Sequence, residues 1–290
     1  MNETIDNKSD LYRAILWMCG TLMSFLTMAI AARELSDTLN PFQIVFMRTS
    51  VALVIVLAMV AHQGKAAIYT QRLPLHFFRN IIHYGANLSW IVGVGLIPLA
   101  QVFALEFSIP IWVALLAVVF LKEKMTIGKI VAIVLGFAGV LIILRPGLVS
   151  IDFGSLAVLA ASLGFAISNV ATKSLARQDS ALTIIFLMFL MQWPIGAIGA
   201  SIVWITPEWA DVPWIALIGV TALTAHYTMT RALMLADATV VIPIDFIRMP
   251  MIAVIGFFFY AEPFSAWIFL GAGLIFAGNY YSIYRERRRG

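Results

Sequence analysis

The chain has few charged residues and a single cysteine. Of its 290 residues only 12% are charged, whereas 62% are hydrophobic and the mean hydropathy is +0.95. In soluble domains about a quarter of the residues are charged, so the composition excludes an ordinary soluble protein and indicates an integral membrane protein. The one cysteine, Cys19, lies inside the first apolar run. A disulfide framework and a cysteine-based metal cluster are therefore excluded.

The sequence also lacks the short motifs of most enzyme classes. It contains no H-E-x-x-H zinc pair, no G-x-S-x-G nucleophile elbow and no Walker motif. Its four histidines, His62, His76, His83 and His226, have poor spacing for a zinc site. We therefore expect no cofactor, no metal and no catalytic activity, with an intramembrane enzyme as a remote alternative. The basic residues stand singly between apolar runs, which argues against nucleic acid as a partner.

Apolar stretches long enough to cross about 30 Å of hydrocarbon recur along the whole chain. They fall near residues 12–31, 42–62, 77–96, 99–120, 126–145, 154–173, 182–204, 213–233, 239–260 and 264–284. Short breaks with proline or polar turn residues separate them. The pattern predicts an all-α polytopic membrane protein with ten transmembrane helices.

One element is used twice. Residues 98–124 form a long apolar run with Pro110 in its interior, and residues 239–262 repeat it with Pro250, 140 residues later. The runs close at Glu123 and Glu262. The same offset of 140 superposes Phe25 on Phe165, Leu35 on Leu175 and Phe46 on Phe186. We predict one long proline-containing helix in each run, and two repeats over residues 12–147 and 152–284, with a tail at 1–11 and a basic tail at 285–290.

The lysines and arginines predict the orientation. With the N-terminus in the cytoplasm, all of them fall on the cytoplasmic side except Arg33, Arg48, Arg145 and Arg248. Each repeat then has five helices, an odd number, so the second repeat is inverted relative to the first. Inverted repeats permit alternating access around a site near the middle of the membrane.

The ten-helix layout resembles a known family. The paired runs with Pro110 and Pro250, the closing Glu123 and Glu262, and the stretch LGFAGVLIILRPG at 135–147 resemble the EamA-type branch of the drug/metabolite transporter superfamily. The resemblance covers nearly the whole chain. It implies a bacterial inner-membrane carrier that moves small organic metabolites without ATP.

The residue pattern of the third predicted helix indicates that this helix forms one wall of a binding site. Arg79, His83 and Asn87 follow one another at helical spacing and give one polar face within an apolar span. Lipid would not tolerate that face. The substrate-binding residues that we predict, from this helix and the helices around it, are Trp17, Asn80, His83, Tyr84, Asn87, Trp90, Asn169, His226 and Tyr227. The plain alternative for serines and threonines on these helices is hydrogen bonding between packed helices.

Ionisable groups within apolar spans are expensive and are functional candidates. Glu106, Asp245 and Arg248 are predicted to act in coupling or gating, with Pro110 and Pro250 as hinges. Asp245 and Arg248 are three residues apart and can equally form a structural ion pair. Arg48, near the end of the second helix, is expected to snorkel or to pair with Glu34 or Asp37.

Aromatic, methionine, amide and imidazole side chains suit an amphipathic small solute. The resemblance to the drug/metabolite transporter superfamily implies a secondary transporter of the bacterial inner membrane, an exporter or facilitator of hydrophobic or aromatic amino acids, and the lysines and arginines predict that both termini are cytoplasmic. The alternative is an uptake carrier for a cofactor or vitamin such as S-adenosylmethionine or riboflavin. The expected partners are the solute and the lipid bilayer, and the protein could be a monomer or a homodimer. Glu106, Asp245, His83 and His226 would support proton exchange, and the alternative is a facilitator driven by the solute gradient.

Overall fold

The computed structural model describes residues 8–64, 68–121, 125–147, 151–235 and 244–287. Every regular element in these ranges is a helix. The helices are α1 (Lys8–Ser36), α2 (Pro41–Gln63), α3 (Leu73–Leu96), α4 (Leu99–Glu106), α5 (Ile109–Leu121), α6 (Ile127–Leu144), α7 (Phe153–Leu175), α8 (Ala181–Ile202), α9 (Val212–Leu235), α11 (Arg248–Tyr260) and α12 (Ala266–Arg287).

Eight segments of the described ranges are long and apolar enough to cross a membrane. One of them, residues 99–116, runs through both α4 and α5. The helix α11 is apolar but shorter, and α3 carries the polar stripe. The prediction of an all-helical protein is confirmed. Of the ten predicted apolar runs, eight correspond to these segments, one corresponds to α3 and one to the shorter α11.

The turn residues seen in the sequence set the ends of several helices. The side chain of Asn40 accepts a hydrogen bond from the backbone N–H of Phe42, with Pro41 at the start of α2. Thr126 and Ser180 cap α6 and α8 in the same way. Gly64 ends α2 with a φ of 88°, a left-handed value that glycine adopts without strain.

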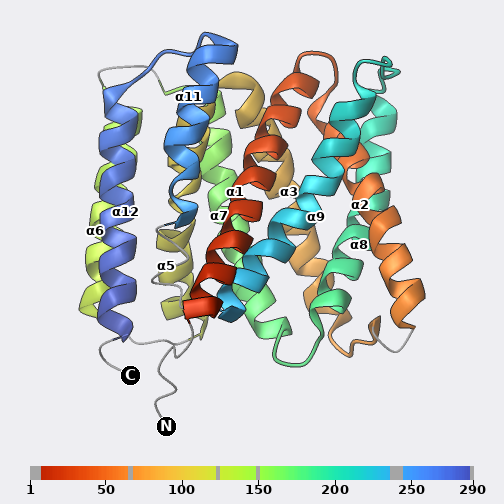
Figure 1. Cartoon of the computed structure of the whole chain (residues 1–290), viewed down its shortest axis with the longest axis horizontal. Coiled ribbons are helices and arrows are strands. Elements are labelled where there is room, and N and C mark those ends of the chain that lie inside the picture. Colours follow the sequence, from red (N-terminus) through yellow and green to blue (C-terminus); the bar gives the residue numbers. More distant parts are fainter. Residues whose placement is uncertain (1–7, 65–67, 122–124, 148–150, 236–243, 288–290) are drawn as a thin grey trace.

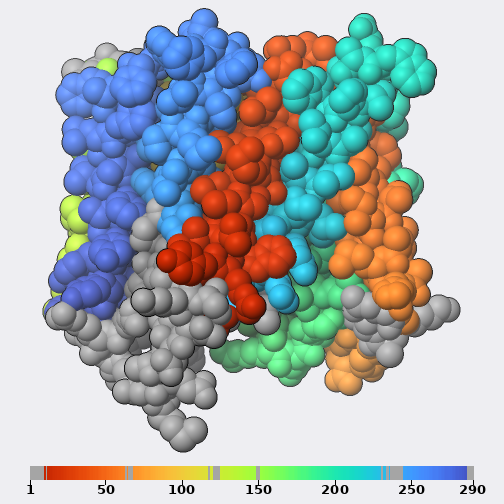
Figure 2. Space-filling view, in the orientation of Figure 1, coloured from red at the N-terminus to blue at the C-terminus, as the bar shows by residue number. Residues whose placement is uncertain are grey.

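The helices pack in long antiparallel pairs. α1 lies along α9, α3 along α7, α2 along α8, and α6 along α12 (Figure 1). Figure 2 shows α1 and α9 packed against each other on this face, between α11 and α2. At the offset of 140, α7 is the counterpart of α1 and α9 is the counterpart of α3. Under this correspondence the packed pair α1 with α9 becomes the packed pair α7 with α3, so the two pairs are equivalent in the two halves of the chain.

The pair α6 and α12 crosses at two glycines. A Cβ on Gly139 would lie 2.4 Å from the carbonyl oxygen of Gly271, and a Cβ on Gly271 would lie 2.5 Å from that of Gly139. Both distances are too short for any side chain, so only glycine permits this approach.

The prediction of one continuous helix at residues 98–124 was wrong. α4 ends at Glu106 and α5 begins at Ile109, with Phe107 and Ser108 forming a turn between them. Pro110 lies in the first turn of α5, where its missing N–H costs no helical hydrogen bond. In the second run, Phe246 and Ile247 form a turn just before α11, and Pro250 lies in the first turn of that helix. Glu123 and residues 239–243 lie outside the described ranges.

Hydroxyl and amide side chains, from the break itself and from other helices, satisfy the backbone at the first break. Ser162 and Ser108 each donate a hydroxyl hydrogen bond to the carbonyl of Leu105, at 3.2 and 2.6 Å. The amide of Asn279 donates to the carbonyl of Phe107 at 3.4 Å. Broken backbone is tolerated at membrane depth only where protein groups replace the lost helical bonds, as they do here.

The two breaks face each other inside the bundle. The rings of Phe107 and Phe246 stack with centroids 4.1 Å apart and planes 26° apart. α4 and α11 are in contact, so the two interrupted helices meet at their interruptions. α1 begins and α12 ends at the same end of the bundle, the lower end in Figure 1. We call this end the lower end and the other the upper end.

Candidate functional site

A cavity of about 290 Å³ lies in the interior, between helices of both halves of the chain. Its apolar walls include Phe25, Met28, Ile91, Phe165 and Met229. The polar side chains that line it are Arg48, His83, Asn87, Trp90, Glu106, Asn169, His226 and Arg248. The cavity thus combines aromatic and methionine surface with amide, imidazole and ionic groups.

The structure brings together many of the predicted site residues. His83, Asn87, Trp90, Asn169 and His226 all line this cavity. Glu106 and Arg248, predicted for coupling or gating, line it as well. The polar stripe of α3 is buried against its neighbours, as its periodicity predicted.

Trp17 and Tyr227 lie outside the central cavity. Their rings contact each other edge to face at 5.9 Å, and Arg231 lies over the Trp17 ring at 5.6 Å. Trp17 lines a separate hollow near the lower end with Arg13 and Arg231. These two aromatic residues therefore join α1 to α9 below the site.

Asn80 and Tyr84 are buried but are not part of the cavity lining. The amide of Asn80 donates to the carbonyl of Leu187 at 3.2 Å, and its oxygen accepts a hydrogen bond from Arg79 at 2.8 Å. It therefore holds Arg79 and attaches α3 to α8. Tyr84 belongs to the apolar core.

A polar chain crosses from α2 through α3 to α8. Nη1 of Arg48 donates to Oδ1 of Asn87, and Nδ2 of Asn87 contacts the backbone oxygen and Nδ1 of His83, at 2.8 and 2.9 Å. Nε2 of Gln192 lies 3.0 Å from the same Nδ1. The expectation that Arg48 snorkels or pairs with Glu34 or Asp37 was wrong, because α2 directs it inward, where it is 6% exposed.

These contacts define the tautomer of His83. Oδ1 of Asn87 must face the guanidinium of Arg48, because the guanidinium can only donate. The NH2 group of Asn87 therefore faces His83, and the opposite orientation of the amide is excluded. Nδ1 of His83 therefore accepts a hydrogen bond from an amide and carries no proton. The ring is neutral, with its proton on Nε2, and it is a hydrogen-bond donor there.

Glu106, Asp245 and Arg248 form one ionic cluster. Nη1 of Arg248 lies 3.4 Å from Oε1 of Glu106, and Nη2 lies 3.0 Å from Oδ2 of Asp245. The indole N–H of Trp90 donates to Glu106 at 2.8 Å. The guanidinium of Arg248 also lies over the rings of Phe25, Phe103 and Phe107, at 4.4, 5.2 and 4.9 Å.

The hydroxyls of α9 bond to α1. Thr228 and Thr21 are 2.9 Å apart, and Thr224 and Ser24 are 3.0 Å apart. These pairs agree with the plain alternative of hydrogen bonding between packed helices.

A second cavity of about 430 Å³ adjoins the first on the side of the lower end. His83, Asn169 and His226 line both cavities, so they form the boundary between them. Its other polar walls are Arg79, Thr172 and Asp179, the last of these in the turn between α7 and α8. The two cavities together lead from the interior toward the lower end.

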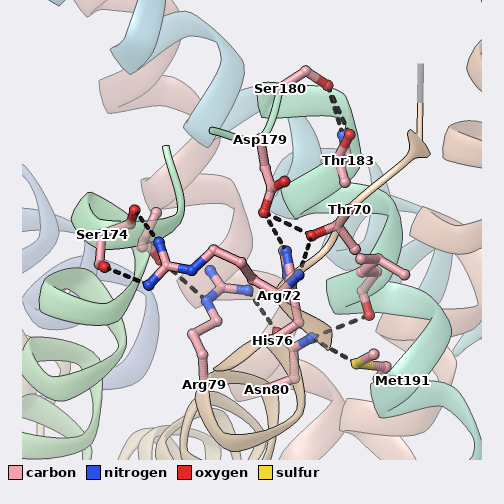
Figure 3. A network of polar contacts seen from close by, with 12 residues as sticks. Thr70, Arg72, His76, Arg79, Asn80, Ser174, Asp179, Ser180, Thr183 and Met191 are labelled. Atoms are coloured by element: carbon pink, nitrogen blue, oxygen red, sulfur yellow. Dashed lines mark hydrogen bonds and ion pairs between the residues drawn. The ribbon is translucent and has the colours of Figure 1, made fainter. Parts of the chain in front are cut away.

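A network of polar contacts joins α3 to the α7–α8 turn at this end (Figure 3). Nε2 of His76 lies 2.9 Å from Oδ2 of Asp179, and Thr70 donates to the same oxygen at 3.0 Å. Arg72 donates to the backbone oxygen and the hydroxyl of Ser174, at 2.7 and 3.0 Å. His76 is fully buried, so this network fixes the start of α3 against α7 and α8.

A different network joins the helices at the upper end. Nη2 of Arg33 donates to Oε1 of Glu262 at 2.8 Å and to the carbonyl of Ile97 at 2.6 Å. The other oxygen of Glu262 accepts from the backbone N–H of Leu99, at the start of α4. Tyr260 donates to Glu34 at 2.7 Å. Burial raises the pKa of Glu262 above its ordinary value, while the Leu99 N–H and Arg33 act in the opposite direction.

Within the described residues no group of three or more histidine, cysteine, aspartate or glutamate side chains could hold a metal ion. Sequence reasoning missed Arg48 and Gln192 as parts of the site. A glutamine in an otherwise apolar helix was an available signal for Gln192. No signal within the sequence placed Arg33 against Glu262, which is 229 residues away.

Comparison with known proteins assigns the chain to a class. Residues 12–145 and 152–284 each match the EamA-like transporter family. A protein of Rickettsia bellii named S-adenosylmethionine uptake transporter is 23% identical over 272 residues, 94% of each chain. A protein of Brucella anthropi named riboflavin transporter is 32% identical over 245 residues, 82% of this chain and 86% of that one. A solved crystal structure with 15% identity has the same fold, with a TM-score of 0.65 over 95% of this chain and 98% of that one.

Proposed function

The chain belongs to the EamA-like transporter family, and from this premise we propose that it carries a cofactor or vitamin into the cell across the bacterial inner membrane. The protein is a multi-pass membrane transporter of the EamA type. The proposed solutes are S-adenosylmethionine, riboflavin or molecules of the same kind, moved without ATP.

The names of the relatives carry this proposal. The proteins of Rickettsia bellii and Brucella anthropi are named for S-adenosylmethionine uptake and for riboflavin, and each aligns with most of this chain. Of the two substrate classes that the sequence left open, they favour the cofactor or vitamin. The first expectation, export of amino acids, has no comparable support.

The chemistry of the cavity supports the same class of solute. Trp90, Phe25 and Phe165 offer aromatic surface on which a planar heterocycle can stack. Asn169 supplies an amide donor and acceptor beside these rings, and Asn87 supplies an amide oxygen with a second lone pair. Ligand sites for drug-sized molecules have volumes of about 300–1,000 Å³, and the two adjoining cavities offer space of this order. We propose that His83, Asn87, Trp90, Asn169 and His226 contact the solute.

The proposed architecture is ten membrane spans in two inverted repeats, residues 12–147 and 152–284. The equivalence of the pairs α1 with α9 and α3 with α7 under the offset of 140 supports it. So does the meeting of the two interrupted helices at Phe107 and Phe246. Inverted repeats place a site between the halves, where the central cavity lies.

The cavities and the two end networks support alternating access. The larger cavity lies on the lower side of the site, where most of the lysines and arginines of the described ranges are, and we propose that this side is cytoplasmic. At the upper end, Arg33 and Glu262 join α1 and α4 to the residues after α11. The arrangement then corresponds to a carrier closed to the outside, with its solute path directed inward.

Uptake by intact bacteria tests this proposal. Cells that lack their own carriers for riboflavin and S-adenosylmethionine should accumulate one of the labelled compounds when they express the protein. Cells that express Asn87→Leu, which removes the amide from the cavity, should accumulate much less. Equal uptake with and without the protein, for both compounds, would contradict the proposal.

A further inference from the structure

Arg48 is a cation of the central cavity that has no carboxylate partner among the described residues. Its side chain is 6% exposed, and its one hydrogen bond goes to the neutral amide of Asn87. Its Nε has no hydrogen-bond partner within the described part of the chain. Most of the donor capacity of the guanidinium is therefore not used by these residues.

The carboxylates of the interior are already engaged elsewhere. Glu106 and Asp245 both pair with Arg248. Glu262 pairs with Arg33 at the upper end, and Asp179 with His76 near the lower end. Arg48 therefore cannot gain an ion pair from any of these groups without breaking another.

A buried guanidinium without a counter-charge is costly, because the desolvation of the charge is not repaid. The planar group presents paired N–H donors that match the two oxygens of a carboxylate or phosphate. An unpaired arginine that lines a cavity is therefore suited to an anionic group brought by the ligand.

The neighbours of Arg48 also present hydrogen-bond donors and positive charge to the cavities. Nδ1 of His83 is an acceptor that Asn87 and Gln192 occupy, so the ring can offer a ligand only its Nε2–H donor. In the adjoining cavity, Arg79 bonds to Thr172 and Asn80, and it too has no carboxylate partner within the described ranges. Hydrogen-bond donors and positive charge thus run along the path from the second cavity to Arg48.

We propose that Arg48 binds an anionic group of the transported solute, a carboxylate or a phosphate, with Nε2–H of His83 as a second donor. This inference rests on the proposed function and narrows its substrate class to solutes that carry such a group. S-adenosylmethionine has a carboxylate, whereas riboflavin has no anionic group at neutral pH. The 5′-phosphate ester of riboflavin supplies the phosphate.

The test is equilibrium binding of four compounds to the purified full-length protein: S-adenosylmethionine, its decarboxylated analogue, riboflavin and riboflavin 5′-phosphate. For an anion held by Arg48, the member of one pair that carries the carboxylate or phosphate should bind more tightly than the member that lacks it. Arg48→Gln should reduce that preference by about 10- to 100-fold, the range of one hydrogen-bonded charge contact. A preference within the first pair identifies a carboxylate as the anion, and a preference within the second pair identifies a phosphate.

Three variants make the result decisive. Arg177→Gln removes a charge from the exposed turn after α7 and should leave all four affinities unchanged. Arg48→Lys keeps a cation without the planar fork and should keep part of the preference. If Arg48→Gln binds nothing and Arg48→Lys restores all four compounds alike, without preference, Arg48 is a structural brace and the inference is wrong.

The two possible failures are distinguishable. Wild-type binding of any of the four compounds, with the same affinities in Arg48→Gln, overturns the role of Arg48 and leaves the proposed function standing. Absence of wild-type binding to all four overturns the proposed function and the inference with it.

Discussion

Glu106 and Arg248 join the two interrupted helices at their interruptions. Glu106 is the last residue of α4 and Arg248 is the first residue of α11, and Oε1 of the one lies 3.4 Å from Nη1 of the other. Asp245 pairs with the same guanidinium, and the indole N–H of Trp90 donates a hydrogen bond to the same carboxylate. The cluster therefore links residues from both halves of the chain at the wall of the cavity.

The first prediction concerns the stability of this cluster. Arg248→Met should leave two carboxylates buried without a counter-charge and lower the free energy of unfolding by about 3–5 kcal/mol. Glu106→Gln removes one charged hydrogen-bond partner while Asp245 still pairs with Arg248, so its cost should be about 2 kcal/mol. Thermal unfolding of the two variants in the same detergent checks the order. A larger loss for Glu106→Gln would contradict this account of the cluster.

The second prediction concerns the helix breaks. Pro110 has no N–H to bond the carbonyl of Glu106, so Pro110→Ala allows α4 and α5 to join into one continuous helix. Pro250→Ala should act similarly at the start of α11. If the breaks bend during transport, both variants should lower the maximal rate more than they change the solute concentration at half-maximal rate. An unchanged rate would count against a hinge.

Gly139 and Gly273 give a matched pair for the packing of α6 against α12. Gly139→Ala places a methyl group 2.4 Å from the carbonyl oxygen of Gly271, and overpacking of this kind costs about 1–3 kcal/mol. A methyl group added at Gly273 would have nothing within 4 Å, so Gly273→Ala should be neutral or should stabilise α12 slightly. Melting temperatures of the two variants test this. Equal effects would mean that the glycine crossing does not set the packing.

The closure of the upper end should depend on pH through Glu262. Burial, the largest influence, raises the pKa of this carboxyl in the closed arrangement above its value in water. Protons therefore bind the closed arrangement more tightly, so closure should strengthen as the pH falls through the raised pKa of Glu262 and weaken as the pH rises through it. The charged and titratable groups around it are Arg33, Glu34 and Tyr260.

Spin labels at positions 37 and 264, both exposed at the upper end, would report this closure in a Cys19→Ser background. The distance distribution between them should shift toward shorter values on acidification. Glu262→Gln cannot titrate and should show no such shift. Longer distances at low pH would contradict the sign of this prediction.

The sequence predicted the features that depend on local periodicity. The polar face of α3 could be read from the spacing of Arg79, His83 and Asn87, because a helix places every fourth residue on one side. The structure buries that face and puts His83 and Asn87 in the cavity wall. The repeated prolines lie beside both breaks, but the prediction made from them, one continuous helix in each run, was wrong.

Features that depend on contacts between distant segments were beyond the sequence. Pro110 signals a disturbance, but the turn at Phe107 and Ser108 is stabilised by hydroxyl and amide groups of Ser162 and Asn279 from other helices. The position of Arg48 in the cavity wall beside Asn87 depends on how α2 packs against α3, which no local pattern records. Its position near the end of an apolar run suggested the membrane surface instead, which was wrong.

The central claim is that the cavity carries a cofactor or vitamin, and counterflow in proteoliposomes tests it most directly. Vesicles preloaded with unlabelled S-adenosylmethionine or riboflavin should take up the same labelled compound transiently, and Asn87→Leu should abolish the overshoot. Vesicles preloaded with phenylalanine should show little or no overshoot of labelled phenylalanine. Counterflow of phenylalanine without counterflow of either cofactor would contradict the account and restore the amino-acid carrier.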